Sequence, residues 1–233
     1  MTGELKSNSD QDGYENAWVD LATYAREVFR TQDRRFMLGF TLCGCRMRLW
    51  HFDRSSACGS SSFDINQDGL AFIRAMLGYH LMTEEQLGLD PTIRGPQGQQ
   101  YVEITRDGQI ERFILTKSIK KQAAIVSRAT TCWRAYRDTD KTKKPFIVKD
   151  SWQYEERPEE GLLIQEATNT GVENIARYYH HETVRICGGI DDTLGNVRRG
   201  MMPCKSIFLR NARPSVVPIQ CVITQKSGTS VVA

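Results

Sequence analysis

The amino-acid sequence predicts an α+β protein, with helices and antiparallel strands in separate stretches of the chain. Apolar residues recur at helical spacing in residues 18–29 and again in residues 70–77. Alternating arms flank short turns at Gly44 and at Asp107-Gly108, and such turns are typical of β-hairpins. Together these patterns favour antiparallel sheets accompanied by a few helices.

The composition is that of an ordinary soluble globular protein. The chain has 233 residues, of which 40% are hydrophobic and 25% are charged, enough for one larger domain or two small ones. No apolar run is long enough to span a bilayer, and the polar residues 1–12 do not have the pattern of a signal peptide. We therefore expect an intracellular protein of the cytoplasm or nucleus, without a membrane partner.

Charge and cysteine content argue against two further classes of function. Lys plus Arg number 31 and Asp plus Glu number 28, and the resulting net charge of +3 is by itself too small to indicate nucleic-acid binding. The 7 cysteines form neither a Cys-x-x-Cys pair nor a Cys/His cluster at zinc-finger spacing. An odd and scattered number of cysteines is typical of reduced, buried thiols.

The first half of the chain predicts an upstream module over residues 16–93. Residues 1–15 are polar and have no hydrophobic period, so we expect a disordered leader there. The predicted elements are a helix over 16–32, a hairpin of 36–43 with 45–52 at a sheet edge, a strand at 63–65, and a helix capped by Asn66 or Asp68. Asp53-Arg54 follows the hairpin, where we expect a buried ion pair or a turn lock.

The second half predicts another unit over residues 99–187. Its expected strands are 101–105 paired with 110–115, 123–126 paired with 132–136, then 146–149 and 175–186. Pro158 predicts the first turn of a helix that carries Leu162, Leu163 and Ala167. The last stretch, 200–233, has no clean period beyond 216–224, so we expect it to be poorly ordered or attached at a sheet edge.

Lys149 ends a short apolar strand that contains Phe146, Ile147 and Val148. Since a buried lysine is costly unless it is paired, the glutamates that open the following helix are candidate partners. Helix geometry favours Glu160, because it shares a face with Leu163 and Ile164, while Glu159 stays an alternative.

A strand lysine paired with a helix glutamate is how protein kinases hold nucleotide phosphates. The plainer alternative is a solvent-exposed lysine on an edge strand, with a charged helix start nearby. The adjacent His180 and His181 favour a structural or solvent role over metal binding, since neighbours on a strand point to opposite faces.

A series of sequence runs resembles, in the same order, the motifs of one known family. Among them are V-K-D-S-W-Q-Y at 148–154 and E-E-G-L-L at 159–163. The others are residues 18–36, 38–54, 87–93, 128–135, 171–184 and 196–200. On these runs the chain resembles the fungal-type protein kinases over about residues 16–200.

The resemblance implies that residues 99–187 form the antiparallel small lobe of a protein kinase, which binds ATP with Mg²⁺. Lys149 then looks like the strand lysine and Glu160 like its helix partner. The turn that covers the phosphates would be Ser127, Arg128, Ala129 and Thr130.

Two departures from the family pattern change what this chain is expected to do. The family turn is similar to Gly-Arg-Gly-Thr, and here Ser127 and Ala129 stand in place of both glycines, which weakens a phosphate cradle. The sequence also has no His-Arg-Asp catalytic loop and no Asp-Phe-Gly triplet. The tail from 200 to 233 is expected to diverge from the family.

We therefore expect a family member that lacks the large lobe, is cut short before the catalytic loop, is catalytically inactive alone, and binds ATP weakly at most. The alternative is a non-enzymatic interaction or regulatory module that pairs with another protein, such as a large lobe supplied in trans.

Overall fold

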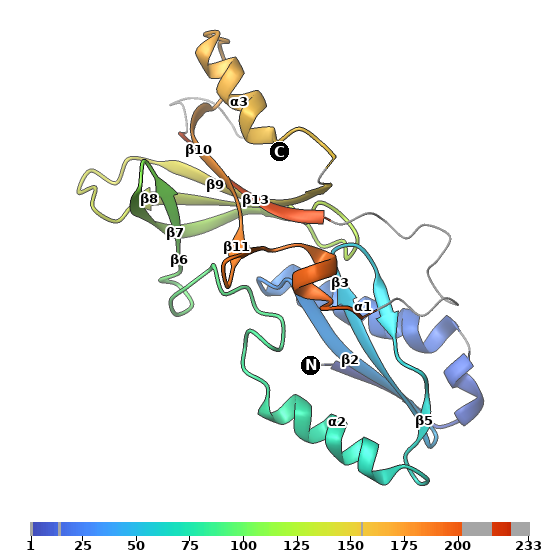
Figure 1. Ribbon diagram of the computed structural model, residues 1–233. Helices are drawn as coiled ribbons and strands as arrows, with labels where there is room; N and C mark the ends of the chain where they lie inside the picture. Colours follow the sequence, from blue (N-terminus) through green and yellow to red (C-terminus); the bar gives the residue numbers. More distant parts are fainter. Residues whose placement is uncertain (1, 14, 155, 202–215, 225–233) are drawn as a thin grey trace. The chain divides into compact units, whose positions relative to one another are not determined.

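The computed structural model describes residues 2–13, 15–154, 156–201 and 216–224, and these form two units (Figure 1). The first unit takes the chain up to Asp90, Ala123–Val126 and residues 193–201. The second takes Pro91–Gln122, the described part of Ser127–Asp192, and residues 216–224. Mostly antiparallel sheets with few helices agree with the predicted α+β class. None of the helices within the described ranges is long and apolar enough to cross a bilayer.

The first unit is a sheet covered on one face by helix α1. Its elements are β1 (Thr2–Lys6), η1 (Ser9–Gly13), α1 (Glu15–Thr31), β2 (Phe36–Cys43), β3 (Arg46–Asp53), β4 (Ala57–Gly59), β5 (Phe63–Asp64), α2 (Gly69–Leu81) and η2 (Thr193–Val197). The strand order is β1-β2-β3-β4, and β5 also pairs with β3. The apolar side of α1, with Leu21 and Phe29, packs on Met37, Trp50 and Phe52. The predicted helix and hairpin are therefore confirmed.

Two expectations about this unit were wrong. The supposed disordered leader contains β1, which pairs in parallel with β2 from Thr2↔Gly39 to Lys6↔Cys43. An edge strand is held by backbone hydrogen bonds, so it needs no strong apolar pattern. The β2–β3 hairpin also does not lie at the sheet edge, because β1 pairs with β2 and β4 pairs with β3.

Asp53 is a buried ion-pair residue, and Arg198 is its partner. Arg198 Nε lies 2.6 Å from Asp53 Oδ2, and Arg198 Nη2 lies 3.0 Å from Oδ1. The Ser55 and Ser56 backbone N–H groups donate to the same carboxylate at 2.8 and 2.9 Å. Arg54 instead stacks over the Phe29 ring at 4.0 Å and donates to the Arg34 carbonyl. The expected buried ion pair therefore forms with Arg198, and the expected turn lock is present in the bonds of Asp53 to Ser55 and Ser56.

The second unit is a six-stranded antiparallel sheet in the order β10-β13-β9-β8-β7-β6. Its elements are β6 (Tyr101–Arg106), β7 (Gln109–Lys121), β8 (Thr131–Arg137), β9 (Phe146–Tyr154), α3 (Glu160–Asn169), β10 (Arg177–Thr183), β11 (Arg185–Ile186), β12 (Gly189–Ile190) and β13 (Val216–Thr224). The Asp107-Gly108 turn is confirmed, with φ of 51° and 75° at its two residues.

The sheet of the second unit curls, so that side chains on the edge strand β10 reach β6 and β7 at the other end of the strand order. The Thr105 N–H on β6 donates to Glu182 Oε2 on β10 at 3.2 Å. The Tyr179 hydroxyl on β10 donates to Glu111 Oε2 on β7 at 2.6 Å. The enclosed face holds the apolar core, whose members are Val102, Ile104, Phe113, Leu115, Trp133, Ala135, Phe146, Val148 and Val222.

Two strand predictions for this unit were wrong. Residues Ala123–Val126 do not pair with β8; the long β7 does, and Ile125 packs on the core of the first unit. Residues 216–224 are not an edge attachment, because β13 lies between β9 and β10 and pairs with both. The other residues of the tail, 202–215 and 225–233, lie outside the described residues.

Candidate functional site

Lys149 lies at the centre of a row of side chains that crosses the second sheet. In the strand register Cys132 on β8 and Cys221 on β13 are its direct partners. Directly paired residues of antiparallel strands project from the same face. Lys120 on β7 pairs with Cys132, and His181 on β10 pairs with Cys221, which extends the row at both ends.

Helix α3 packs over this row because Gly161 has no side chain. A Cβ at Gly161 would lie 2.2 Å from His181 Cγ and 2.4 Å from His181 Cβ. Gly161 is the buried residue of α3, whereas Leu163 is 57% exposed. The expected apolar face containing Leu163 was therefore wrong, and a glycine contact sets how closely the helix approaches β10.

The two glutamates at the start of α3 have different partners. Glu160 Oε1 forms an ion pair with Lys149 Nζ, whose side chain is 19% exposed. Glu159 Oε2 lies 2.9 Å from His181 Nε2, and Glu159 Oε1 accepts from the Thr183 hydroxyl at 3.2 Å. The preference for Glu160 as the partner of Lys149 agrees with this geometry, and Glu159 anchors the helix to β10.

Positive charge exceeds negative charge around this ion pair. Arg128 Nη1 lies 3.9 Å from Glu160 Oε2, and exposed Lys120 projects from the same sheet face as Lys149. Two cations, Lys149 and Arg128, thus share the Glu160 carboxylate, and Lys120 adds positive charge farther along the same face, which leaves the site attractive to an anion.

The cysteines on either side of Lys149 are apolar spacers rather than nucleophiles. Burial raises the pKa of the Cys221 thiol to about 12, and burial also raises the pKa of Cys132 despite the nearby Lys149 charge. Both thiols are therefore protonated near neutral pH, and a protonated thiol is a poor nucleophile.

The turn before β8 has a backbone shape that suits glycine but carries other residues. Ala129 has a φ of +46°, in the left-handed region where an L side chain is strained. The Ser127 hydroxyl accepts the Ala129 N–H at 3.0 Å, so this donor is used within the turn. The Arg128 carbonyl accepts the Trp152 N–H at 2.7 Å, and the Thr130 carbonyl accepts the Gln122 N–H at 3.1 Å.

The structure brings three of the predicted residues together, namely Lys149, Glu160 and Arg128. Ser127, Ala129 and Thr130 lie in the same turn and bond mainly within it or to the adjacent strand ends. Sequence reasoning missed Lys120, Cys132, Cys221 and His181, because only the strand register places them beside Lys149 or one another.

Each residue of the histidine pair contacts a neighbouring polar side chain. The Nδ1 of His181 lies 2.9 Å from the Tyr178 hydroxyl, and His180 Nε2 lies 3.1 Å from Glu182 Oε2. Within the described residues, no group of three or more His, Cys, Asp or Glu side chains could hold a metal ion.

A family model described as a fungal protein kinase matches residues 1–229. The match extends beyond 16–200 in both directions, so it includes β1, β13 and most of the tail that was expected to diverge. A search of the curated proteins and a search of the solved structures each gave no match.

Proposed function

Because the chain belongs to the fungal protein kinase family, we propose that its second unit is a kinase small lobe and that Lys149 binds nucleotide phosphates there. The observation that carries the proposal is the ion pair between Lys149 on β9 and Glu160 on α3. In protein kinases this pair positions the lysine against the phosphates.

The order of elements supports the same proposal. The turn at 127–130 lies between β7 and β8. The strand after them, β9, carries the lysine, and the next helix, α3, carries the glutamate. A kinase small lobe has this order, with a glycine-rich loop between its first two strands and the lysine on the third.

The residues present suit the phosphates of ATP better than they suit its metal ion. Lys120, Arg128 and Lys149 supply positive charge for the phosphates, and ATP when bound would supply the transferable phosphoryl group. Magnesium in kinases is held by groups that this sequence lacks, namely the Asp of Asp-Phe-Gly and the catalytic-loop Asn. The strained, internally bonded turn at Ala129 offers fewer free N–H donors. We therefore propose weak ATP binding, with little added by Mg²⁺.

We also propose that the 233-residue chain alone does not transfer phosphate. Transfer needs a residue that positions the hydroxyl nucleophile, and each missing group of this kind costs about 10³-fold or more in rate. This proposal predicts no autophosphorylation with radiolabelled ATP. Incorporation above that of a Lys149→Ala control would overturn it.

Thermal unfolding with ATP tests the phosphate site directly. We expect 10 mM ATP to raise the melting temperature by about 2–5 °C, as a millimolar ligand of the native state should. Adenosine, which has no phosphates, should raise it less. Lys149→Ala should abolish the shift, and Lys144→Ala, an exposed lysine in the loop before β9, should preserve it. An equal shift in wild type and Lys149→Ala would refute the site.

One observation favours a second function: the Ala129 N–H already donates a hydrogen bond to the Ser127 hydroxyl. If the turn cannot accept phosphate, the unit serves as a non-enzymatic interaction or regulatory module, and a large lobe supplied in trans is the proposed partner. No ATP stabilisation, combined with co-elution of this chain and a separately expressed family large lobe, would favour this function. Stabilisation that depends on Lys149 would favour the first.

A further inference from the structure

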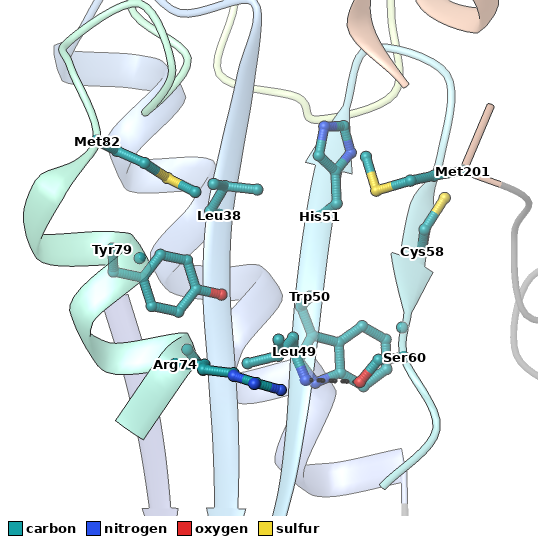
Figure 2. Close-up of a pocket in the computed structure, with 13 residues that line it drawn as sticks. Leu38, Leu49, Trp50, His51, Cys58, Ser60, Arg74, Tyr79, Met82 and Met201 are labelled. Atoms are coloured by element: carbon teal, nitrogen blue, oxygen red, sulfur yellow. Dashed lines mark hydrogen bonds between the residues drawn. The ribbon is translucent and has the colours of Figure 1, made fainter. Parts of the chain in front are cut away.

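A pocket of about 520 Å³ lies between α2 and the face of the first sheet that looks toward this helix (Figure 2). Leu38, Leu49 and Trp50 contribute to it from β2 and β3, and Tyr79 and Met82 contribute from α2 and its C-cap. The volume lies in the range typical of small-molecule sites.

The pocket exists because α2 does not pack closely on the sheet. None of the α2 residues is buried, although Tyr79 donates a hydrogen bond to the Gly39 carbonyl at 3.1 Å. A Cβ built on Gly78, which lines the pocket, would meet nothing within 4 Å. Gly78 therefore leaves room for a larger side chain at the pocket.

His51 is a buried polar residue in the pocket wall. Only 4% of it is exposed, and neither ring nitrogen has a hydrogen-bond partner among the described residues. The carboxylate oxygen Oδ2 of Asp53 lies 3.7 Å from His51 Nδ1, too far for a good hydrogen bond. Burial lowers the pKa of His51 to about 4, so the ring is neutral near pH 7.

Arg74 supplies the charge at the pocket. This exposed α2 residue lines the pocket, and Figure 2 shows its extended side chain beside Leu49. No aspartate or glutamate is among the described residues that line the pocket, so this lining carries net positive charge. The remaining lining is largely apolar, including Leu38, Leu49 and Met82. A ligand that complements this lining has an apolar body and an anionic end.

We propose that this pocket binds an apolar carboxylic acid, with its hydrocarbon part between α2 and the sheet and its carboxylate at Arg74. The hydrocarbon part gains by leaving water for contacts with Leu38, Leu49 and Met82. The carboxylate forms a charge-assisted hydrogen bond with the guanidinium group. The site belongs to the first unit, and it does not depend on nucleotide binding at Lys149.

Calorimetric titration with octanoate and with 1-octanol tests this proposal, because the two probes share a hydrocarbon chain and differ in charge. We expect one octanoate site per chain. Gly78→Leu should fill the pocket and weaken binding of both probes at least about tenfold. Gly69→Leu is the matched control: it lies on the same helix in open space outside the pocket, and it should leave both affinities unchanged.

Arg74→Gln separates the contribution of the carboxylate from that of the hydrocarbon chain. We expect about a five- to tenfold loss of octanoate affinity and no change for octanol. The fold should survive Gly78→Leu, because glycine in a helix interior is itself unfavourable, and equal thermal stability of the two leucine variants would verify this. No octanoate binding at 10 mM, or unchanged affinity in Gly78→Leu, would overturn the site. Unchanged octanoate affinity in Arg74→Gln would overturn the assignment of an acid.

Discussion

His51 should make the stability of the first unit depend on pH. In the unfolded chain it takes up a proton near pH 6.5, whereas in the folded chain burial holds its pKa at about 4. Acidification between these values therefore favours unfolding, with a maximum loss of about 3 kcal/mol. The nearby charges oppose each other, since Asp53 raises this pKa and Arg198 lowers it. Arg74, Cys58 and Tyr79 are the other titratable groups around the same pocket.

Hydrogen exchange of β2 and β3 at several pH values would measure this effect. We expect the pH dependence between 6.5 and 4 to shrink in His51→Phe, whose ring can keep the stacking on Phe36 seen at 4.9 Å. His80→Gln, on exposed α2, should leave the pH profile unchanged. A profile that is the same in all three proteins would contradict a buried neutral imidazole.

Helix α3 is positioned by the absence of a side chain at Gly161. We expect Gly161→Ala to destabilise the second unit by about 1–3 kcal/mol, because the new methyl group overlaps the base of the His181 side chain. Moving the helix outward would also stretch the bond from Glu160 to Lys149. Urea denaturation would measure the change.

Gly78→Ala is the control for this substitution. The same change in α2 meets nothing within 4 Å, so it should stabilise by about 0.5–1 kcal/mol through helix propensity alone. If both alanine variants gained stability, the close contact between α3 and β10 would not constrain the helix.

The turn at 127–130 has a backbone conformation that suits glycine, but it contains no glycine. We expect the double variant Ser127→Gly, Ala129→Gly to bind ATP about tenfold more tightly, because it frees the Ala129 N–H and removes the strain at φ +46°. Titration with ATP would show this. Gln109→Gly, at an exposed position, is the control for added chain flexibility, and it should leave the affinity for ATP unchanged. An unchanged affinity in the double variant would mean that this turn does not contact phosphate.

Local patterns predicted those elements that are held by local contacts. The periodicity of α1, the Asp107-Gly108 turn and the Asp68 cap of α2 are short-range signals, and all three are present in the structure. The Lys149–Glu160 pair was also readable, because its two residues lie on consecutive elements.

Long-range pairing explains what the sequence did not predict. β13 is a central strand only because β9 and β10, far earlier in the chain, leave a gap between them. Cys221 therefore reaches Lys149 through the sheet register and not through any spacing. Ile125 and Val126 favour a strand, but Ile125 packs on the core of the first unit instead.

At the scale of the whole molecule, Arg198 links two distant parts of the chain within the first unit. Asp53 is completely buried; burial alone would raise its pKa, but the hydrogen bonds and charge of Arg198 hold the pKa below its usual range. We expect Arg198→Ala to cost about 3–5 kcal/mol, because it leaves a buried carboxylate without its cation.

Exposed Arg199 next to it provides the control, since Arg199→Ala should change stability by less than about 0.5 kcal/mol. Urea denaturation followed by hydrogen exchange in β3 would compare the two variants. A double variant, Asp53→Asn with Arg198→Ala, should recover part of the loss, because the uncompensated charge is gone. Equal stability of the two single variants would show that the ion pair does not support this unit.

The central position of β13 also has a consequence during synthesis. β9, with Lys149, is complete at Tyr154, but the strand that covers its other side is complete only at Thr224, about 70 residues later. At a translation rate of about 5–20 residues per second, that edge waits roughly 4–14 s for its partner. An unpaired strand edge can associate with other chains. The nascent protein should therefore need a chaperone most while the ribosome is translating the segment between β10 and β13.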